Sequence, residues 1–259
     1  MPGSRQSGRC RWGMTMWMSM LVVLAIALGA GSQAPPAAVT NACAACHLRL
    51  ALTRSAITHV DQWVTSRHAL ARVGCEKCHG GDATTSNQAA AHRGVMNSAD
   101  PSSAVHRMAL PASCGRCHQP EGDAFARSAH QKLLSQGDAR VPTCTSCHSS
   151  MAADVLSPIA LETQCLYCHH NDREGRAPLA KRELEEVIRL RTTLTRAKRQ
   201  VAVMDSDRRT SLTSQWTDAD VSLRAVVAAI HAFDQRRVEE LLRDSKDQTE
   251  RLVATLPKR

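Results

Sequence analysis

A chain of 259 residues is long enough for one or two domains. Aromatic residues make up only 3% of it, with one Tyr, two Phe and four Trp, so few large side chains are available for an ordinary core. The formal net charge is +9, but no basic run is interleaved with aromatic residues, and a nucleic-acid-binding protein is therefore not expected.

The first 34 residues have the pattern of an export segment. Arg5, Arg9 and Arg11 precede an apolar stretch that runs from Trp12 to Ala30. A positively charged start followed by an apolar run is typical of a secretory signal. The run is also near the lower limit for a membrane-spanning helix, so an uncleaved anchor with its arginines on the cytoplasmic side is the alternative. We predict that residues 1–34 are a signal peptide or an N-terminal membrane anchor, and that the remainder is exported to the periplasm, either soluble or anchored.

Within residues 35–175 one short pattern, Cys-x-x-Cys-His, occurs five times and takes up ten of the eleven cysteines. Two cysteines at this spacing can form thioethers to the two vinyl groups of a porphyrin, and the adjacent histidine can then bind the iron. The copies are Cys43-Ala-Ala-Cys46-His47, Cys75-Glu-Lys-Cys78-His79, Cys114-Gly-Arg-Cys117-His118, Cys144-Thr-Ser-Cys147-His148 and Cys165-Leu-Tyr-Cys168-His169.

A single copy of this pattern would also fit a redox-active dithiol or half of a zinc site. Neither alternative needs a histidine directly after the second cysteine in all five copies. The sequence therefore predicts five covalently bound c-type haems, each with its iron bound by the motif histidine. Residues 35–175 are too few to build an ordinary apolar core and also house five haems. We therefore expect the haems themselves to form most of the core of this region. Each haem carries two propionates, and five haems would offset most of the net charge of +9.

Little regular structure is expected between the motifs. Short helices are predicted to lead into them, for example over Val60–Arg72 and Asp123–Ser135.

Histidines outside the motifs are candidates for the second axial position of each iron, because imidazole is a suitable iron ligand. The alternative for any one of them is a solvated or hydrogen-bonded side chain. Most keep a regular spacing, either 12 or 13 residues after a motif histidine or 7 or 8 residues before the next motif. The predicted ligands are His59, His68, His92, His106, His130 and His170.

Two further residues of this region have open roles. His170 directly follows His169, and neighbouring side chains of an extended segment point to opposite sides, so His170 could bind a different haem from His169. Met151 could be an axial ligand, with ordinary packing as the alternative.

The residues around the motifs resemble those of multihaem cytochromes c. The resemblance rests on Trp63-Val-Thr-Ser-Arg-His68 before the second motif and on Phe125-Ala-Arg-Ser-Ala-His130 before the fourth. It is to the broad superfamily that includes the nitrifier tetrahaem cytochromes and the NapC/NrfH-type quinol dehydrogenases, and it covers roughly residues 40–170. The Cys-x-x-Cys-His-His sequence at His169-His170 is also found in the small tetrahaem cytochromes of sulfate reducers. The chain departs from these relatives in having five motifs and a long C-terminal region.

From about residue 176 cysteine is absent and apolar residues recur at alternating steps of three and four. This predicts two amphipathic helices with a break at Asp205–Asp207, and a third helix with Asp234 as its N-cap. We expect residues 176–259 to form a helical hairpin or three-helix bundle packed on the haem-binding region, with an oligomerisation or partner-docking element as the alternative. His231, near the end of the second helix, could be solvated or could bind a haem. The apolar positions are Val187, Leu190, Leu194, Ala197, Val201 and Met204 in the first helix and Leu212, Trp216, Ala219, Leu223, Val226, Ile230 and Phe233 in the second.

Together these patterns predict a mainly α protein with irregular coil, in which a haem-organised region precedes a helical C-terminal domain. The function most consistent with closely spaced haems is electron transfer between a quinol-linked membrane donor and a periplasmic or extracellular acceptor. The expected partners are a membrane quinol-oxidising complex or other redox proteins, with possible membrane association through the N-terminus and none with nucleic acid. The alternatives are a membrane-anchored quinol dehydrogenase and a reductase of a small oxyanion, of the nitrite or hydroxylamine type, with one open haem. No Cys-x-x-Cys-Lys motif of the kind found in pentahaem nitrite reductases occurs, and no catalytic residue is predicted.

Overall fold

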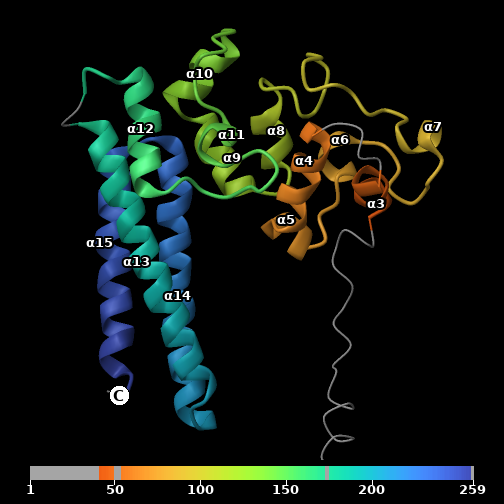
Figure 1. Cartoon of the computed structure of the whole chain (residues 1–259). Coiled ribbons are helices and arrows are strands. Elements are labelled where there is room, and N and C mark those ends of the chain that lie inside the picture. Colours follow the sequence, from red (N-terminus) through yellow and green to blue (C-terminus); the bar gives the residue numbers. More distant parts are fainter. Residues whose placement is uncertain (1–40, 50–53, 173–174, 258–259) are drawn as a thin grey trace, which may run out of the picture. The chain divides into compact units, whose positions relative to one another are not determined.

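The computed structural model describes residues 41–49, 54–172 and 175–257. Helices up to α12 are short and are joined by irregular segments, whereas α13, α14 and α15 are long (Figure 1). The predicted mainly α fold with irregular coil and C-terminal helices is confirmed. The predicted export segment, residues 1–34, lies outside the described residues. Among the helices that are described, none has the length and apolar character needed to cross a membrane.

The short helices belong to the segment that carries the motifs. They are α3 (Ala42–Arg49), α4 (Arg54–Val64), α5 (Arg67–Leu70), α6 (Glu76–His79), α7 (Gln88–Ala91), α8 (Leu110–Gly115), α9 (Gln119–Ala126), α10 (Ala129–Ser135), α11 (Cys144–Cys147) and α12 (Pro158–Cys168). The long helices are α13 (Arg176–Ala202), α14 (Ser206–Ala232) and α15 (Gln235–Thr255).

The two helices predicted before the second and fourth motifs are each broken in two, so the predicted bounds Val60–Arg72 and Asp123–Ser135 are wrong. The first is divided into α4 and α5, and the second into α9 and α10. A buried serine causes each break, because its side chain caps the second helix of the pair. The oxygen of Ser66 accepts a bond from a backbone N–H at 3.1 Å, and that of Ser128 does so at 3.0 Å.

The same local structure therefore occurs twice. The backbone N–H of each serine donates to the carbonyl of an aromatic residue three positions earlier, Trp63 or Phe125, at 2.9 Å. Both aromatic side chains are buried. A histidine follows each serine by two residues, in the first turn of the new helix, so His68 and His130 begin from equivalent backbone frames.

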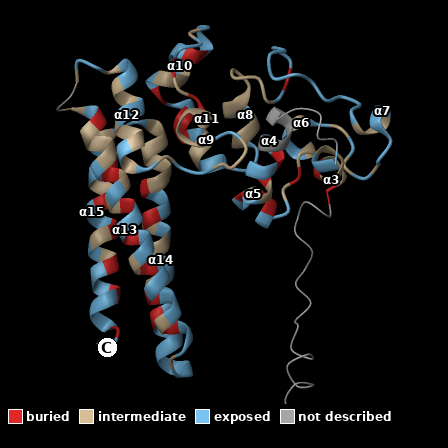
Figure 2. Cartoon of the chain, in the orientation of Figure 1, coloured by how far each residue is buried: buried red, intermediate tan, exposed pale blue. Residues whose placement is uncertain are grey.

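The three long helices pack against one another around a continuous apolar core, as the heptad-like pattern predicted. The buried positions lie on the inner sides of these helices (Figure 2). The indole N–H of Trp216 also donates to the carbonyl of Leu194 on the neighbouring helix at 2.9 Å. Asp205, in the predicted break, caps α14 through its side chain, and Asp234 caps α15 as predicted.

Phe233 departs from the predicted apolar stripe. It is 47% exposed and is the C-cap of α14, where its φ of 56° lies in the left-handed region. The chain turns away from the helix axis at this residue, so its side chain leaves the bundle core. It lies instead against Phe125 and His130 of the motif-bearing segment.

One acidic side chain is buried in the bundle. Glu183 on α13 is 7% exposed, and no described residue hydrogen bonds its Oε1. Burial, followed by the nearby carboxylate of Glu239, raises the pKa of Glu183 from 4.5 to about 7. Between these two values the folded chain holds a proton that the unfolded chain has lost. Raising the pH through this range therefore lowers the free energy of unfolding.

We expect Glu183→Gln to remove this pH dependence. At about pH 8 the variant should be more stable than the parent by on the order of 1 kcal/mol, and at about pH 5 the two should be similar. Urea unfolding followed by far-ultraviolet circular dichroism measures the difference. Glu185→Gln, at an exposed position of the same helix, is the control and should keep the parental pH profile. Equal pH profiles for the Glu183 variant and the parent would contradict the assignment.

Candidate haem-binding site

Each motif lies in a helical turn or at its end. In four of them the backbone N–H of the motif histidine donates to the carbonyl of the first cysteine at 2.9 Å, as for Cys75 and His79. Residues three and four positions apart lie on the same face of a helix. The two thiols and the imidazole of a motif therefore share one face, which is the arrangement that attachment to one side of a porphyrin requires. The other three motifs with this bond are those of His118, His148 and His169.

The geometry does not favour the zinc or dithiol alternatives. Within the described ranges no group of three or more His, Cys, Asp or Glu side chains is arranged to hold a metal ion. Within the described residues, no disulfide joins any two of the ten motif cysteines. Burial raises the pKa of Cys75 and of Cys147 to about 11, which disfavours a thiolate at these two positions.

Four motif histidines each lie close to one histidine from outside the motifs. Their ring centres are 6.0–6.2 Å apart. The pairs are His47 with His92 at 6.0 Å, His118 with His68 at 6.1 Å, His148 with His231 at 6.1 Å, and His169 with His130 at 6.2 Å.

The remaining motif histidine, His79, has His59 as its neighbour. Burial lowers the pKa of His79, and the nearby charge of His59 lowers it further. His59 itself is exposed on α4. All five motif histidines therefore have one non-motif histidine close by.

These pairs have the span that a metal ion between two imidazoles requires. Two imidazole–metal bonds of about 2 Å each, plus the distance from each bonded nitrogen to its ring centre, add up to about 6 Å. Aromatic rings in ordinary contact have similar centre distances, so one pair alone would carry little weight. The recurrence of the same pairing, always between one motif and one non-motif histidine, fits a haem iron held from both faces.

The hydrogen bonds of the non-motif histidines leave one ring nitrogen available. Nδ1 of His92 lies 2.8 Å from the carbonyl of Gln88, and Nδ1 of His231 lies 2.7 Å from that of Val227. A backbone carbonyl on Nδ1 fixes the tautomer and directs Nε2 toward a metal. A hollow of about 570 Å³ opens beside His92, lined also by Asn87, Gln88 and Ala89.

Of the six predicted ligands, the structure brings His59, His68, His92 and His130 next to a motif histidine. In the described part of the chain it does not bring His106 or His170 into such a pair. His106 accepts a bond at Nδ1 from the backbone N–H of Met108 at 3.3 Å, and His170 is exposed.

Two other residues also take definite places. Met151 packs against the small cluster of Ala44, Val60, Trp63 and Ala69. The sequence left His231 open, either as a solvated side chain or as a haem ligand, because it lies far from any motif and no spacing could decide between the two.

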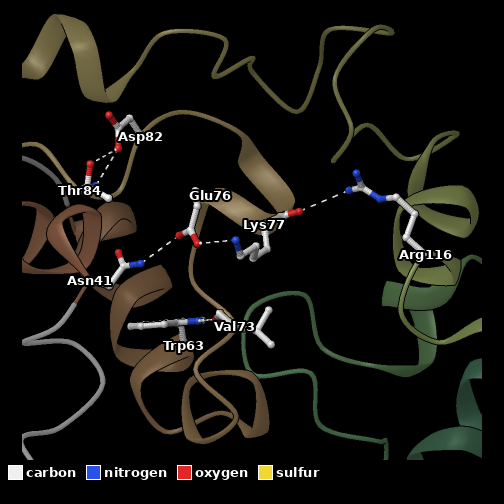
Figure 3. A network of polar contacts seen from close by, with 8 residues as sticks. All are labelled: Asn41, Trp63, Val73, Glu76, Lys77, Asp82, Thr84 and Arg116. Carbon is white, nitrogen blue, oxygen red and sulfur yellow. Dashed lines mark hydrogen bonds and ion pairs between the residues drawn. The ribbon is translucent and has the colours of Figure 1, made fainter.

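Residues inside the motifs also tie the first three motifs together (Figure 3). Asn41 caps α3, where its Oδ1 accepts from the N–H of Ala44 at 3.1 Å, and its Nδ2 donates to Glu76 of the second motif at 3.1 Å. Arg116 of the third motif donates to the carbonyl of Lys77 of the second at 3.3 Å. The two variable positions of a motif thus fix its place relative to its neighbours.

Consecutive motifs are neighbours in space. Burial raises the pKa of both Cys75 and Cys78, and the charge of a cysteine in a neighbouring motif raises it further. That neighbour is Cys43 for Cys75 and Cys114 for Cys78. Cys114 and Cys144 share a thiol hydrogen bond, which lowers the pKa of Cys144 to about 7. The fifth motif follows the fourth in the same way, since Cys165 helps to raise the pKa of Cys147. The order along the chain is therefore also the order of contact.

A tight turn after the second motif places the segment of His92. Gly81 has a φ of +85°, and a Cβ there would lie 2.3 Å from the carbonyl oxygen of Ala91. The N–H of Asp82 donates to that same oxygen at 3.0 Å. Only glycine at position 81 lets its backbone approach the backbone of Ala91 this closely.

We expect Gly81→Ala to destabilise the protein by about 1–3 kcal/mol more than Gly137→Ala. Gly137 has a similar φ of +91° but nothing within 4 Å of its Cβ position, so it reports the backbone strain without the clash. Urea unfolding of both variants measures the difference. Equal losses of stability would show that the close approach to Ala91 does not constrain this turn.

Comparisons with known proteins agree with this geometry. A family model described as "Cytochrome c554 and c-prime" matches residues 29–80, which include the first two motifs. The chain is 27% identical over 119 residues to the C-type polyheme cytochrome OmcC of Geobacter sulfurreducens. That match covers 44% of this chain and 15% of the relative, so the chain spans only a small part of the relative's length. No solved structure matches it significantly.

In its motifs and in these matches the chain resembles the c-type cytochromes, whose members carry covalently bound haem c. More specifically, these matches support a likeness to the multihaem cytochromes c.

Proposed function

We propose that the chain is a periplasmic pentahaem cytochrome that transfers electrons. In it, two histidines coordinate each haem iron at its axial positions. The ten motif cysteines hold five haems, and the five motif histidines bind their irons from one face. The haems supply one-electron chemistry, at potentials that axial ligand, burial and hydrogen bonding adjust.

The histidine pairs carry this proposal. Within the motif-bearing segment they support one second ligand for each of four motifs. These assignments are His92 for the first motif, His59 for the second, His68 for the third and His130 for the fifth.

Two histidines at an iron leave no open position for a substrate. This favours an electron carrier over a reductase of a small oxyanion, which needs an open coordination site. Ligation by two histidines also gives lower potentials than ligation by histidine and methionine. The contact between consecutive motifs supports electron exchange along the whole segment, from the motif of His47 to that of His169.

The donor we propose is a quinol-oxidising complex of the membrane, and the acceptor is a periplasmic or extracellular redox protein. Residues 1–34 would direct export and could keep the protein at the membrane. Residues 35–175 would form the haem domain and residues 176–259 the helical domain. The similarity to OmcC, a C-type polyheme cytochrome, is consistent with such a role.

The haem content and the ligation state of the purified exported protein test the proposal. We expect five covalently bound haems per chain by mass, and five low-spin irons by EPR and magnetic circular dichroism. Carbon monoxide and nitrite should not bind. Fewer haems, or an iron that takes up either ligand in the parent protein, would contradict the proposal and restore the reductase alternative.

Replacing one proposed ligand should open one iron. We expect His92→Ala to convert one low-spin haem to a high-spin haem that binds one carbon monoxide per chain. His106→Ala is the matched control and should leave every haem low-spin, since His106 is not paired with a motif histidine among the described residues. The reverse result would assign the iron of the first or a neighbouring motif to His106 instead.

A further inference from the structure

The last turn of α14 brings a histidine of the C-terminal domain to the fourth motif. The ring of His231 lies 6.1 Å from that of His148, and the two planes are only 11° apart. Nδ1 of His231 bonds the carbonyl of Val227 one turn earlier at 2.7 Å, so Nε2 is the nitrogen left free.

We propose that His231 is the second axial ligand of the haem held by Cys144 and Cys147. Phe233, two residues later, positions His130, the proposed ligand of the fifth haem. The inference rests on the proposed function, because it takes the fourth motif as a haem site. It makes the three-helix domain part of the haem site rather than a separate docking module.

The bundle fixes the direction of the ligand. On the same helix, Leu223 and Val226 are 3% and 0% exposed, and Ile230 packs against the core that they form. α14 also contacts α9, the helix that follows the third motif. The end of α14 is therefore held on one side by the bundle and on the other by the motif-bearing segment, and His231 lies in its last turn.

Phe233 extends this contact to the fifth motif. Its ring meets that of His130 edge-on, with centres 4.3 Å apart at an angle of 81°, and it lies 6.4 Å from Phe125. His130 is the histidine paired with His169, and no described residue hydrogen bonds its buried Nδ1. Its ring is therefore oriented by packing rather than by a hydrogen bond. Phe233, which turns out of the bundle core, supplies this packing contact to the ring of His130.

The ring planes give the fourth haem a distinctive spectrum. Nearly parallel axial imidazoles produce a rhombic low-spin EPR signal, whereas strongly tilted ones produce a more anisotropic signal. The planes of the His47, His118 and His169 pairs are tilted by 44°, 54° and 67°, against 11° for His148 and His231. The haem of the fourth motif should therefore contribute the most rhombic signal among these four.

The test is His231→Ala in the full chain, with His170→Ala as the control. We expect His231→Ala to retain five haems by mass, to lose one rhombic low-spin signal, and to bind one carbon monoxide per chain. His170→Ala should retain every signal and bind none. Five low-spin haems with no carbon monoxide binding in the His231 variant would overturn the inference and leave the pentahaem proposal intact. Fewer than five haems in the parent protein would instead contradict the pentahaem proposal.

His231→Met keeps the test valid if the alanine variant does not fold. Methionine can still bind iron, so we expect one of the five haems to rise in reduction potential, as exchange of an axial histidine for methionine requires. No change in any potential would overturn the inference. For the positioning role, Phe233→Ala should alter the low-spin signal of one haem without carbon monoxide binding, and Phe233→Tyr should restore it. An unchanged spectrum in Phe233→Ala would overturn that part.

Discussion

In the proposed haem arrangement, each iron needs two imidazole rings whose centres lie about 6 Å apart, the span of two axial bonds to one metal, and four histidine pairs have this separation. A motif supplies the first ring through a local helical turn, because the two thiols and the histidine then share one face. The second ring must come from elsewhere in the chain. His92 lies beyond the second motif but pairs with His47 of the first, and His68 lies before the second motif but pairs with His118 of the third. These crossed pairings tie segments together that have few apolar contacts of their own.

This constraint explains why the motif-bearing segment has so little ordinary core. Its described apolar clusters are small, one around Trp63 and one around Phe125 and Leu134. Irregular segments with short capped helices are well suited to placing ligands, since a cap such as Ser66 or Ser128 sets the direction of the histidine two residues later. The C-terminal domain is the opposite case, because its three helices form a continuous apolar core from their own side chains. In the proposed arrangement the two parts meet where α14 presents His231 and Phe233.

Much of this could be predicted from sequence. The Cys-x-x-Cys-His pattern is a local signal, and the heptad-like spacing, the break at Asp205–Asp207 and the cap at Asp234 identified the long helices. The breaks at Ser66 and Ser128 were missed, because the apolar pattern continues through both serines while their burial and capping geometry is visible only in the fold. Axial pairing is a long-range property, so spacing to a motif could nominate His92 and His106 alike. It could not nominate His231, whose place depends on how the bundle packs against the fourth motif.

An experimental structure of the haem-loaded protein, with the irons located by anomalous scattering, tests the central claim most directly. The account expects five irons, each between one motif histidine and one partner: His92, His59, His68, His231 and His130 for the first to fifth motifs in turn. An iron bound by His106, His170 or Met151, or one with an open axial position, would contradict it.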